Sequence, residues 1–388
     1  MCSPCDCGHK GVPNGAQSEL TPSELKQCRR CGSEPFVCID KVRIECRQCF
    51  SEFCNKKFRT TIGKSKLVKN NESILLAYSG GPNSTALLDL IHSSMMYDAG
   101  RDQKFKVSIL HIDTSSISRL QSDLLGDHEL EKHAGDIDKR IEFLARRYPK
   151  WPIYFTTIEK YFTESHKMPS NSDFYPRHEP LYDCPAYLKY TCDIDLYSRE
   201  YKDSILELCN DEAAEGQMRS FLENTISDKT DRQRIVCDCC FRLIDRVAAD
   251  IKEREDPDLK FVMTGSAITR LSNDLLVDVI LGRGSNIGHD VKICDRRTRI
   301  PIMRPLREFS SKEIAYYLKA RDILKDVCVT PNLMTFTGRK DTIQSLTESF
   351  LSRLSLDFPS TYNTLLNTGN KMNDTMATAD SNRLLPAG

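Results

Sequence analysis

Apolar runs take turns with helical patterns through the middle of the chain. The short runs have the length and composition of buried strands, and the longer stretches repeat apolar residues at the spacing of one helix face. Strands and helices in alternation are typical of a parallel, doubly wound sheet, so the sequence predicts an α/β fold. The expected strands lie at 74–77, 107–112, 153–155, 261–263 and 300–303, and the expected helices at 85–96, 130–148, 240–252, 268–281 and 342–354.

The same pattern divides the chain into four parts. A cysteine-rich head covers 1–54, a basic linker or arm covers 55–72, and the α/β domain covers 73–358. Between about 161 and 230 that domain loses its periodicity to Pro, Asp, Ser and Tyr, which indicates an insertion at the rim of the sheet. Polar residues dominate 359–388, so we expect a C-terminal tail with too few apolar residues to form a core.

The composition is that of a globular protein with balanced charge. Of 388 residues, 39% are hydrophobic and 28% charged, and Lys plus Arg equals Asp plus Glu at 55 each. Zero net charge excludes a uniformly basic nucleic-acid binder, although it is compatible with a basic patch. No apolar run approaches the roughly 18 residues of a membrane helix, and the start of the chain lacks the apolar core of a secretory signal. We therefore expect a cytoplasmic protein.

Nine of the seventeen cysteines fall within the first 54 residues. In a reducing compartment they are thiols or metal ligands rather than disulfides. Cys28 and Cys31 form one C-x-x-C pair, and Cys46 and Cys49 form a second pair 14 residues later. Two such pairs can turn four thiolates toward one tetrahedral ion, so we predict a structural Zn²⁺; the alternative is free cysteines on a loop. A second ion would need ligands from Cys2, Cys5, Cys7 and His9, with Cys38 and Cys54 as further candidates.

A glycine-containing turn, Ser79-Gly80-Gly81, links an apolar strand to an amphipathic helix. Glycines let the backbone approach a phosphate closely, while the helix start and the hydroxyls of Ser79 and Ser84 provide hydrogen-bond donors. The motif therefore predicts a phosphate-binding loop, and the alternative is a tight turn with no ligand.

These residues and several later segments resemble a known family. The loop from Ser79 to Ser84 is similar to the pyrophosphate loop of the adenine nucleotide alpha hydrolase-like class, whose members adenylate a substrate carbonyl. The strand 110–113 looks like the adenine-side strand of that class, which implies a nucleotide contact for Asp113. Over most of its length the chain resembles the thiouridylase subunit 2 family of cytoplasmic tRNA 2-thiolation. The segments similar to the tRNA 2-thiolation branch are 262–266, 273–276, 281–284 and 303–306.

Three departures from the active relatives bear on the role of this chain. The loop has Asn83 where they carry the aspartate that helps to hold Mg²⁺. Ser266 stands where they have a histidine followed by paired carboxylates. Cys237 and Cys240 offer a C-x-x-C pair, but 307–310 offers no third cysteine, so we expect no iron–sulfur cluster in this chain. The resemblance therefore implies a non-catalytic or weakly active subunit without catalytic residues, in which ATP and Mg²⁺ bind weakly or are supplied by a partner.

The resemblance also implies partners. In the family, a heterodimer converts the wobble uridine of tRNA to 2-thiouridine, with ATP activating the uridine carbonyl and a thiocarboxylated ubiquitin-like carrier delivering the sulfur. The expected partners are the catalytic subunit 1 homologue, tRNA and the sulfur carrier, and no membrane. The alternatives are a self-sufficient ATP-dependent tRNA sulfurtransferase and a scaffold with an empty nucleotide loop.

Two basic clusters are candidates for contact with the tRNA backbone. Because the overall charge is balanced, only clustering can focus a positive field on RNA. The alternative for each cluster is a solvated charged face. The candidates are Lys56, Lys57, Arg59, Lys64 and Lys66 in the arm, and Arg297, Arg299 and Arg304 late in the α/β domain.

Overall fold

A computed structural model describes most of the chain, and its contacts divide the chain into a unit of residues 1–50 and a unit of residues 51–388. In the first unit, β1 (Val37–Ile39) pairs antiparallel with β2 (Arg43–Glu45), with Val37 opposite Glu45. Helix α1 (Arg47–Ser65) begins in this unit and continues into the second. The described residues are 27–39, 43–69, 71–97, 105–117, 137–164, 187–191, 204, 211–224, 228–284, 287–327 and 342–383.

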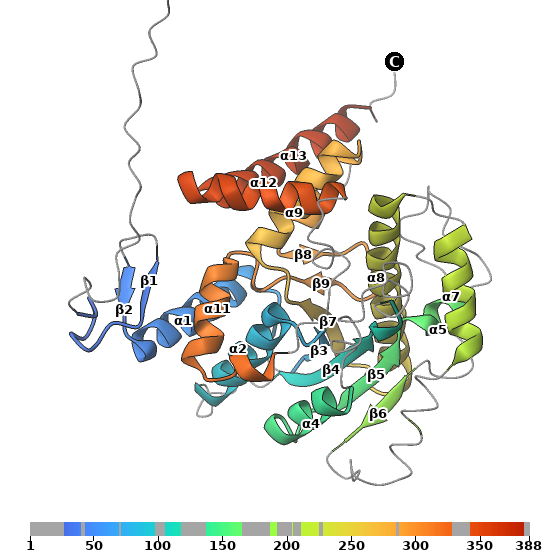
Figure 1. Ribbon diagram of the computed structural model, residues 1–388, viewed down its shortest axis with the longest axis horizontal. Helices are drawn as coiled ribbons and strands as arrows, with labels where there is room; N and C mark the ends of the chain where they lie inside the picture. Colours follow the sequence, from blue (N-terminus) through green and yellow to red (C-terminus); the bar gives the residue numbers. More distant parts are fainter. Residues whose placement is uncertain are drawn as a thin grey trace, which may run out of the picture. The chain divides into compact units, whose positions relative to one another are not determined.

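The described residues of the second unit contain a sheet with the strand order β6-β5-β4-β3-β7-β9-β8 (Figure 1). The five inner strands run parallel, and β6 and β8 pair antiparallel at the two edges. The α/β fold expected from the sequence is therefore confirmed. The strands are β3 (Ser73–Tyr78), β4 (Lys106–Asp113), β5 (Ile153–Thr157), β6 (Leu188–Tyr190), β7 (Leu259–Thr264), β8 (Cys294–Asp295) and β9 (Ile302–Met303).

The central strands are mostly apolar and buried, as is typical of a sheet whose two faces are both covered. Leu75 of β3 and Val262 of β7 belong to one core cluster with Leu243 and Val247 of helix α8 (Lys229–Arg254). The other helices are α2 (Pro82–Tyr97), α4 (Ile137–Arg147), α5 (Glu159–Glu164), α7 (Glu212–Asn224), α9 (Ile268–Ile280), α10 (Ile287–Asp290), α11 (Ser311–Ala320), α12 (Ile343–Asp357) and α13 (Thr361–Arg383).

The basic arm expected at 55–72 is helical as far as Ser65, which corrects the expectation of a linker. Cys54, Phe58 and Thr61 are spaced four and three residues apart, and all three are buried. This spacing places them on one face of α1, so the helix has an apolar face to pack as well as its basic residues. The charge run alone does not indicate that face.

The C-terminal segment also differs from the expected tail, because residues 361–383 form α13. Leu366 packs with Leu275 and Val291 in a small core cluster. A Cβ at Gly369 would lie 2.5 Å from Cδ1 of Leu275, so the absence of a side chain lets α13 approach α9. Figure 1 shows α12 and α13 beside α9.

Two further expectations fall partly or wholly outside the described residues. Within the insertion expected at 161–230, β6 pairs with β5 and α7 is formed. The candidate ligands of a second ion in the first nine residues lie outside the described part of the chain. Among the described helices, none is long and apolar enough to cross a membrane.

Candidate functional site

The first candidate site is the cysteine quartet of Cys28, Cys31, Cys46 and Cys49. Its four sulfur atoms all lie within 4.8 Å of one another. Sγ of Cys31 is 3.5 Å from Sγ of Cys46 and 3.6 Å from Sγ of Cys49. Backbone turns shape both ends: the Gly32 N–H donates to the Cys28 carbonyl at 2.9 Å, and the Cys49 N–H donates to Sγ of Cys46 at 3.4 Å. The structure thus brings together the four thiols that the sequence pairs.

The quartet has the size of a single-ion site. Four thiolates around a tetrahedral ion at about 2.3 Å stand about 3.8 Å apart, close to the observed separations. Hydrogen bonding from Ser33 lowers the pKa of Cys31 to about 6, whereas burial raises the pKa of Cys49. The Cys31 sulfur is thus mostly a thiolate at neutral pH, the form that binds a metal. A bound cation would supply the positive charge that stabilises the buried thiolates. The cluster could therefore hold a metal.

The second candidate site is the glycine turn at the carboxyl end of β3. Gly80 has φ +79°, a conformation that favours glycine. The Ser84 hydroxyl makes two hydrogen bonds within this turn. It accepts one from the Ser79 backbone N–H at 3.3 Å and donates one to the Gly81 carbonyl at 3.1 Å. These bonds hold the turn against the first residues of α2, whose free N–H groups and dipole favour an anion.

The end of β7 lies directly against this loop. A Cβ at Gly265 would be 2.8 Å from the Ser84 backbone nitrogen, so only glycine fits there. Asn83, in the same loop, has a neutral amide at the position where the resemblance implies a carboxylate. The arrangement can cradle a phosphate with backbone N–H groups, but it places no negative side chain at that loop position for Mg²⁺.

Asp113, the predicted nucleotide contact at the end of β4, is buried and has other partners. Its carboxylate accepts hydrogen bonds from the Ser115 backbone and hydroxyl and lies 3.8 Å from Arg140. The neighbouring His111 is also buried, and its Nδ1 lies 2.8 Å from the Tyr78 carbonyl oxygen. Burial, followed by the charge of Arg140, lowers the pKa of His111 to about 4, so this histidine is neutral at pH 7.

The resemblance implies a third cysteine within the segment 307–310 of the active relatives, and in this chain that segment contains Phe309. Phe309 is buried beneath Lys57, whose Nζ lies 4.7 Å from the ring centre. Cys237 and Cys240 lie on α8, and burial raises the pKa of both thiols. Within the described residues, the Cys28–Cys49 quartet is the one group of three or more such ligands close enough to share a metal ion.

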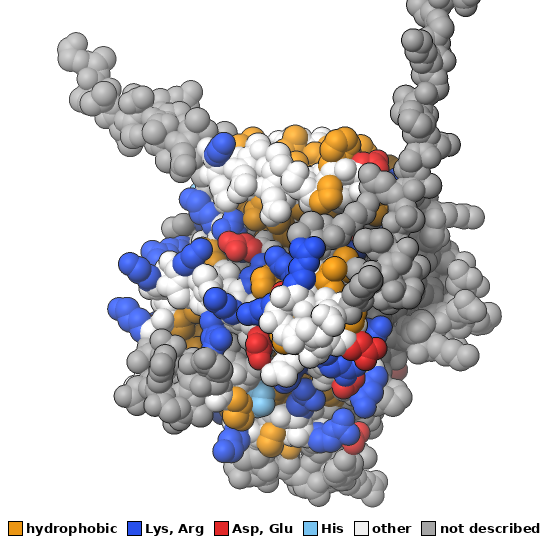
Figure 2. All heavy atoms as spheres, turned by 90° about the vertical axis from the view of Figure 1, so that its left-hand side faces the viewer, with side chains coloured by type: hydrophobic (Ala, Val, Ile, Leu, Met, Phe, Trp, Pro, Cys, Tyr) orange, Lys and Arg blue, Asp and Glu red, His pale blue; other side chains and the backbone are white. Residues whose placement is uncertain are grey.

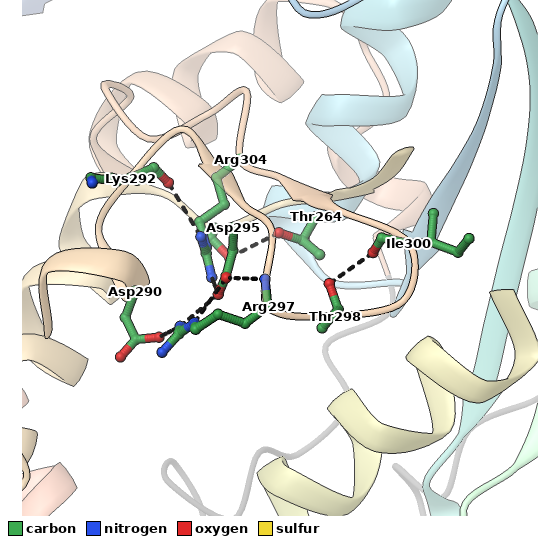
Figure 3. A network of polar contacts seen from close by, with 9 residues as sticks. Thr264, Asp290, Lys292, Asp295, Arg297, Thr298, Ile300 and Arg304 are labelled. Atoms are coloured by element: carbon green, nitrogen blue, oxygen red, sulfur yellow. Dashed lines mark hydrogen bonds and ion pairs between the residues drawn. The ribbon is translucent and has the colours of Figure 1, made fainter. Parts of the chain in front are cut away.

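The basic candidates separate into exposed and paired side chains. Lys57 donates to both carboxylate oxygens of Glu313 at 2.9 Å. Arg297 and Arg304 both pair with Asp295 (Figure 3), and Arg299 lies beside Asp245. Figure 2 shows Lys and Arg side chains spread over the face that it presents, with acidic side chains among them; of the candidates in the arm, Lys56, Lys64 and Lys66 are exposed and Arg59 is half-buried.

A cavity that no sequence motif indicates lies beside α8 and α9. Its walls combine Gln233, Phe241 and Arg270, which belong to no pattern described above, with residues that the sequence analysis names, among them Cys237, Ser266 and Arg304. Its residues come from six helices and strands and the segments between them, so local spacing in the sequence does not indicate that they share a cavity. The cavity is considered further below.

The parallel sheet and the phosphate loop at the end of its central strand define an α/β protein of the pyrophosphate-loop type. The U34-tRNA thiolase NcsA from Methanococcus maripaludis, solved with its [4Fe-4S] cluster, has the same fold, with a TM-score of 0.54 and 13% sequence identity. The match covers 89% of this chain and 88% of the thiolase. No protein-family model matches the sequence.

Relatives in sequence identify the branch of that class. Cytoplasmic tRNA 2-thiolation protein 2-B of Xenopus laevis is 29% identical over 405 residues, which cover 97% of this chain and 74% of the relative. Cytoplasmic tRNA 2-thiolation protein 2 of Danio rerio is 30% identical over 374 residues, covering 92% of this chain and 69% of the relative. The chain belongs to the cytoplasmic tRNA 2-thiolation protein 2 family.

Proposed function

We propose that this chain is the non-catalytic or weakly active subunit of a cytoplasmic heterodimer that 2-thiolates wobble uridine 34 of tRNA. The observation that carries the proposal is the loop after β3, which keeps the backbone of a phosphate site but has Asn83 at the carboxylate position. A neutral amide oxygen is a weaker ligand for Mg²⁺ than a carboxylate. The names of the vertebrate relatives support tRNA 2-thiolation, and that of the archaeal thiolase supports uridine 34 as the target.

The loop retains the groups for residual nucleotide binding. Ser79, Gly80, Gly81 and Ser84 surround the start of α2, where N–H groups can receive a phosphate. Asp113 would reach a nucleotide only by leaving Ser115 and Arg140. We therefore assign this chain weak binding of ATP at most.

The chemistry that this chain lacks comes from the partner in this proposal. ATP activates the uridine carbonyl, and a thiocarboxylated ubiquitin-like carrier delivers the sulfur. A catalytic subunit 1 homologue supplies the acidic loop residue and the third cysteine that Asn83 and Phe309 replace here. This chain contributes assembly and tRNA binding.

The metal of the cysteine quartet is zinc in this proposal. A closed site of four thiolates with no open position is typical of structural Zn²⁺. An iron–sulfur cluster is larger than one ion and needs cysteines further apart than the 3.5 and 3.6 Å found here. Zinc would fix the β1–β2 hairpin and the start of α1 relative to each other, because Cys46 and Cys49 flank that start.

The tRNA contacts of this chain come from the exposed side of α1. The exposed Lys56 and Lys64 and the half-buried Arg59 lie on the helix, and the exposed Lys66 follows it. Lys57 is engaged with Glu313, and Arg297, Arg299 and Arg304 are engaged with aspartates. We therefore assign RNA contact to the first group and structural roles to the second.

The proposal predicts a clear effect in cells. Deletion of the gene for this chain is expected to remove wobble 2-thiouridine from total tRNA, measured by mass spectrometry of nucleosides. Re-expression of the unchanged chain is expected to restore it. A normal 2-thiouridine content in the deletion strain would contradict the proposed function.

A further inference from the structure

A cavity of about 210 Å³, whose accessible lining is more apolar than polar, is bordered by residues of α8, α9, α10, α12 and the β8–β9 pair. Seven arginines and six aspartates contribute to its walls, and we call it the arginine–aspartate cavity. Leu271, Leu275 and Ile302 add an apolar part to the lining. A single water needs roughly 10–15 Å³ of such a volume, so the cavity has room for a ring system.

The charges on the walls are paired with one another. Arg297 bonds to Asp290 and Asp295, and Figure 3 shows these side chains meeting Arg304 in one network. On the helices, Nε of Arg270 lies 3.4 Å from Asp274. Because each of these cations has a carboxylate beside it, the walls do not make a simple anion site. They present hydrogen-bond donors and acceptors side by side, as a neutral polar heterocycle requires.

Two glutamines in the lining have unused hydrogen-bonding capacity. Gln233 is 2% exposed, and neither its amide nitrogen nor its amide oxygen has a partner among the described residues. Gln344 is 4% exposed; its nitrogen donates to the Thr230 carbonyl at 3.0 Å, whereas its oxygen has no partner within the same residues. A buried amide without a partner is unfavourable, so a ligand that draws such an amide into the cavity and pairs with it gains affinity.

An aromatic ring completes the lining. Phe241 of α8 is 41% exposed although it is a large apolar side chain. Exposed rings beside a polar pocket are the usual platform for stacking a base, and base–aromatic stacking does not depend on which base is present. The Phe241 ring could therefore contact the flat face of an aromatic ligand, and the glutamines could form hydrogen bonds with its edge.

We propose that the arginine–aspartate cavity binds a nucleobase, stacked on Phe241 and hydrogen-bonded at its edge to Gln233. The base belongs either to a free nucleotide or to a nucleotide extruded from an RNA chain. An extruded base is read by stacking and by hydrogen bonds to its pairing edge, and both are available here. The RNA source rests on the proposed function, whereas the recognition of a base does not.

Saturation-transfer NMR on the full chain tests base recognition. The probes are the four nucleoside 5′-monophosphates, with ribose 5-phosphate and inorganic phosphate as base-free controls. We expect transfer to the base protons of at least one nucleotide. Gln233→Leu, which removes the amide at similar volume, and Phe241→Ala are each expected to weaken that binding about tenfold.

Matched variants separate recognition from general damage. Phe241→Tyr keeps the ring and is expected to retain binding, as is Gln217→Leu on the exposed surface of α7. The proposal is overturned if no base protons receive saturation, if ribose 5-phosphate binds as tightly as the nucleotides, or if Gln233→Leu and Phe241→Ala both bind like the unchanged chain.

Photocrosslinking identifies the source of the base. A tRNA transcript carrying 5-iodo pyrimidines is irradiated with the full chain, and the peptide that contains Phe241 is analysed by mass spectrometry. A crosslink at Phe241 assigns the cavity to RNA; nucleotide binding without a crosslink assigns it to a free nucleotide. Because base binding is measured without thiolation, its failure leaves the proposed function intact, and the reverse also holds.

Discussion

At the scale of single residues, the capacity of the loop after β3 to bind Mg²⁺ depends on Asn83. The turn and the start of α2 are built from backbone and hydroxyl groups, which Ser79, Gly81 and Ser84 provide. A carboxylate at position 83 would add a charged ligand for Mg²⁺, and the amide does not. Restoring that charge therefore tests whether Asn83 alone, or several changed residues together, account for the proposed loss of catalytic activity.

We predict that Asn83→Asp does not by itself make the chain an active thiolase. The change restores one element and leaves Ser266 and Phe309 in place. Residues that act as a unit are not repaired singly. The measurement is 2-thiouridine formed by the purified variant without a partner, with ATP, Mg²⁺, tRNA and a sulfur donor. Robust partner-independent thiolation would refute the prediction.

Lys57 is the residue whose role the structure changes most. Its ammonium is bonded to Glu313, whose carboxylate also accepts from the Ser310 N–H at the start of α11. We predict that Lys57→Ala lowers the free energy of unfolding by about 2 kcal/mol, because a charge-assisted contact and a cation–π contact are lost. Denaturant unfolding measures the change, and an unchanged midpoint would show that the pair contributes nothing.

At the scale of elements, α1 joins two roles in one helix. Cys54 and Phe58 pack inward, while Lys56 and Lys64 are exposed. We predict that changing Lys56, Arg59, Lys64 and Lys66 together to Ala weakens tRNA binding by the assembled heterodimer and lowers its salt dependence by up to about four units of log–log slope.

The Lys57→Ala variant is the matched control for that measurement. It removes one positive charge from the same helix, but from a side chain engaged with Glu313, so the salt slope is expected to stay unchanged. Pull-down with the partner checks that both variants still assemble. An unchanged tRNA affinity and slope in the quadruple variant would leave α1 as a solvated face and assign the RNA to other surfaces.

The cysteine quartet makes a prediction about metal content. We predict one Zn²⁺ per chain purified without chelator, lost when Cys28 and Cys46 are both changed to Ser, because two thiolates cannot close a tetrahedral site. Cys38→Ser, outside the quartet, is expected to retain the ion. Elemental analysis of the purified chain and its variants measures the zinc and iron content. Iron in place of zinc, or zinc retained in full by the double variant, would be inconsistent with the assignment.

The strands and the glycine turn could be predicted from sequence because their signals are local. The expected run 74–77 lies within β3, and Ser310 and Glu313, three positions apart in the sequence, form a capping box at the start of α11. The pairing of Lys57 with Glu313 spans 256 positions, and no local pattern contains it. For the same reason the sequence does not show that Arg297 and Arg304 both pair with Asp295.

At the scale of the whole molecule, the fold retains the frame of a pyrophosphate-loop protein while individual positions have changed. The sheet order and the loop put the proposed phosphate site at the carboxyl end of β3, where such sheets bind ligands. Asn83, Ser266 and Phe309 are distributed over three segments of that frame. A chain built in this way is suited to support a catalytic partner, which is the central claim of the proposal.

Thiolation by purified components tests that claim most directly. Unmodified tRNA, ATP, Mg²⁺ and a thiocarboxylated carrier are combined with this chain, with the catalytic subunit homologue, or with both, and 2-thiouridine is measured by mass spectrometry. The account predicts no product from this chain alone and efficient product only when both subunits are present. Efficient 2-thiouridine formation by this chain without its partner would contradict the account.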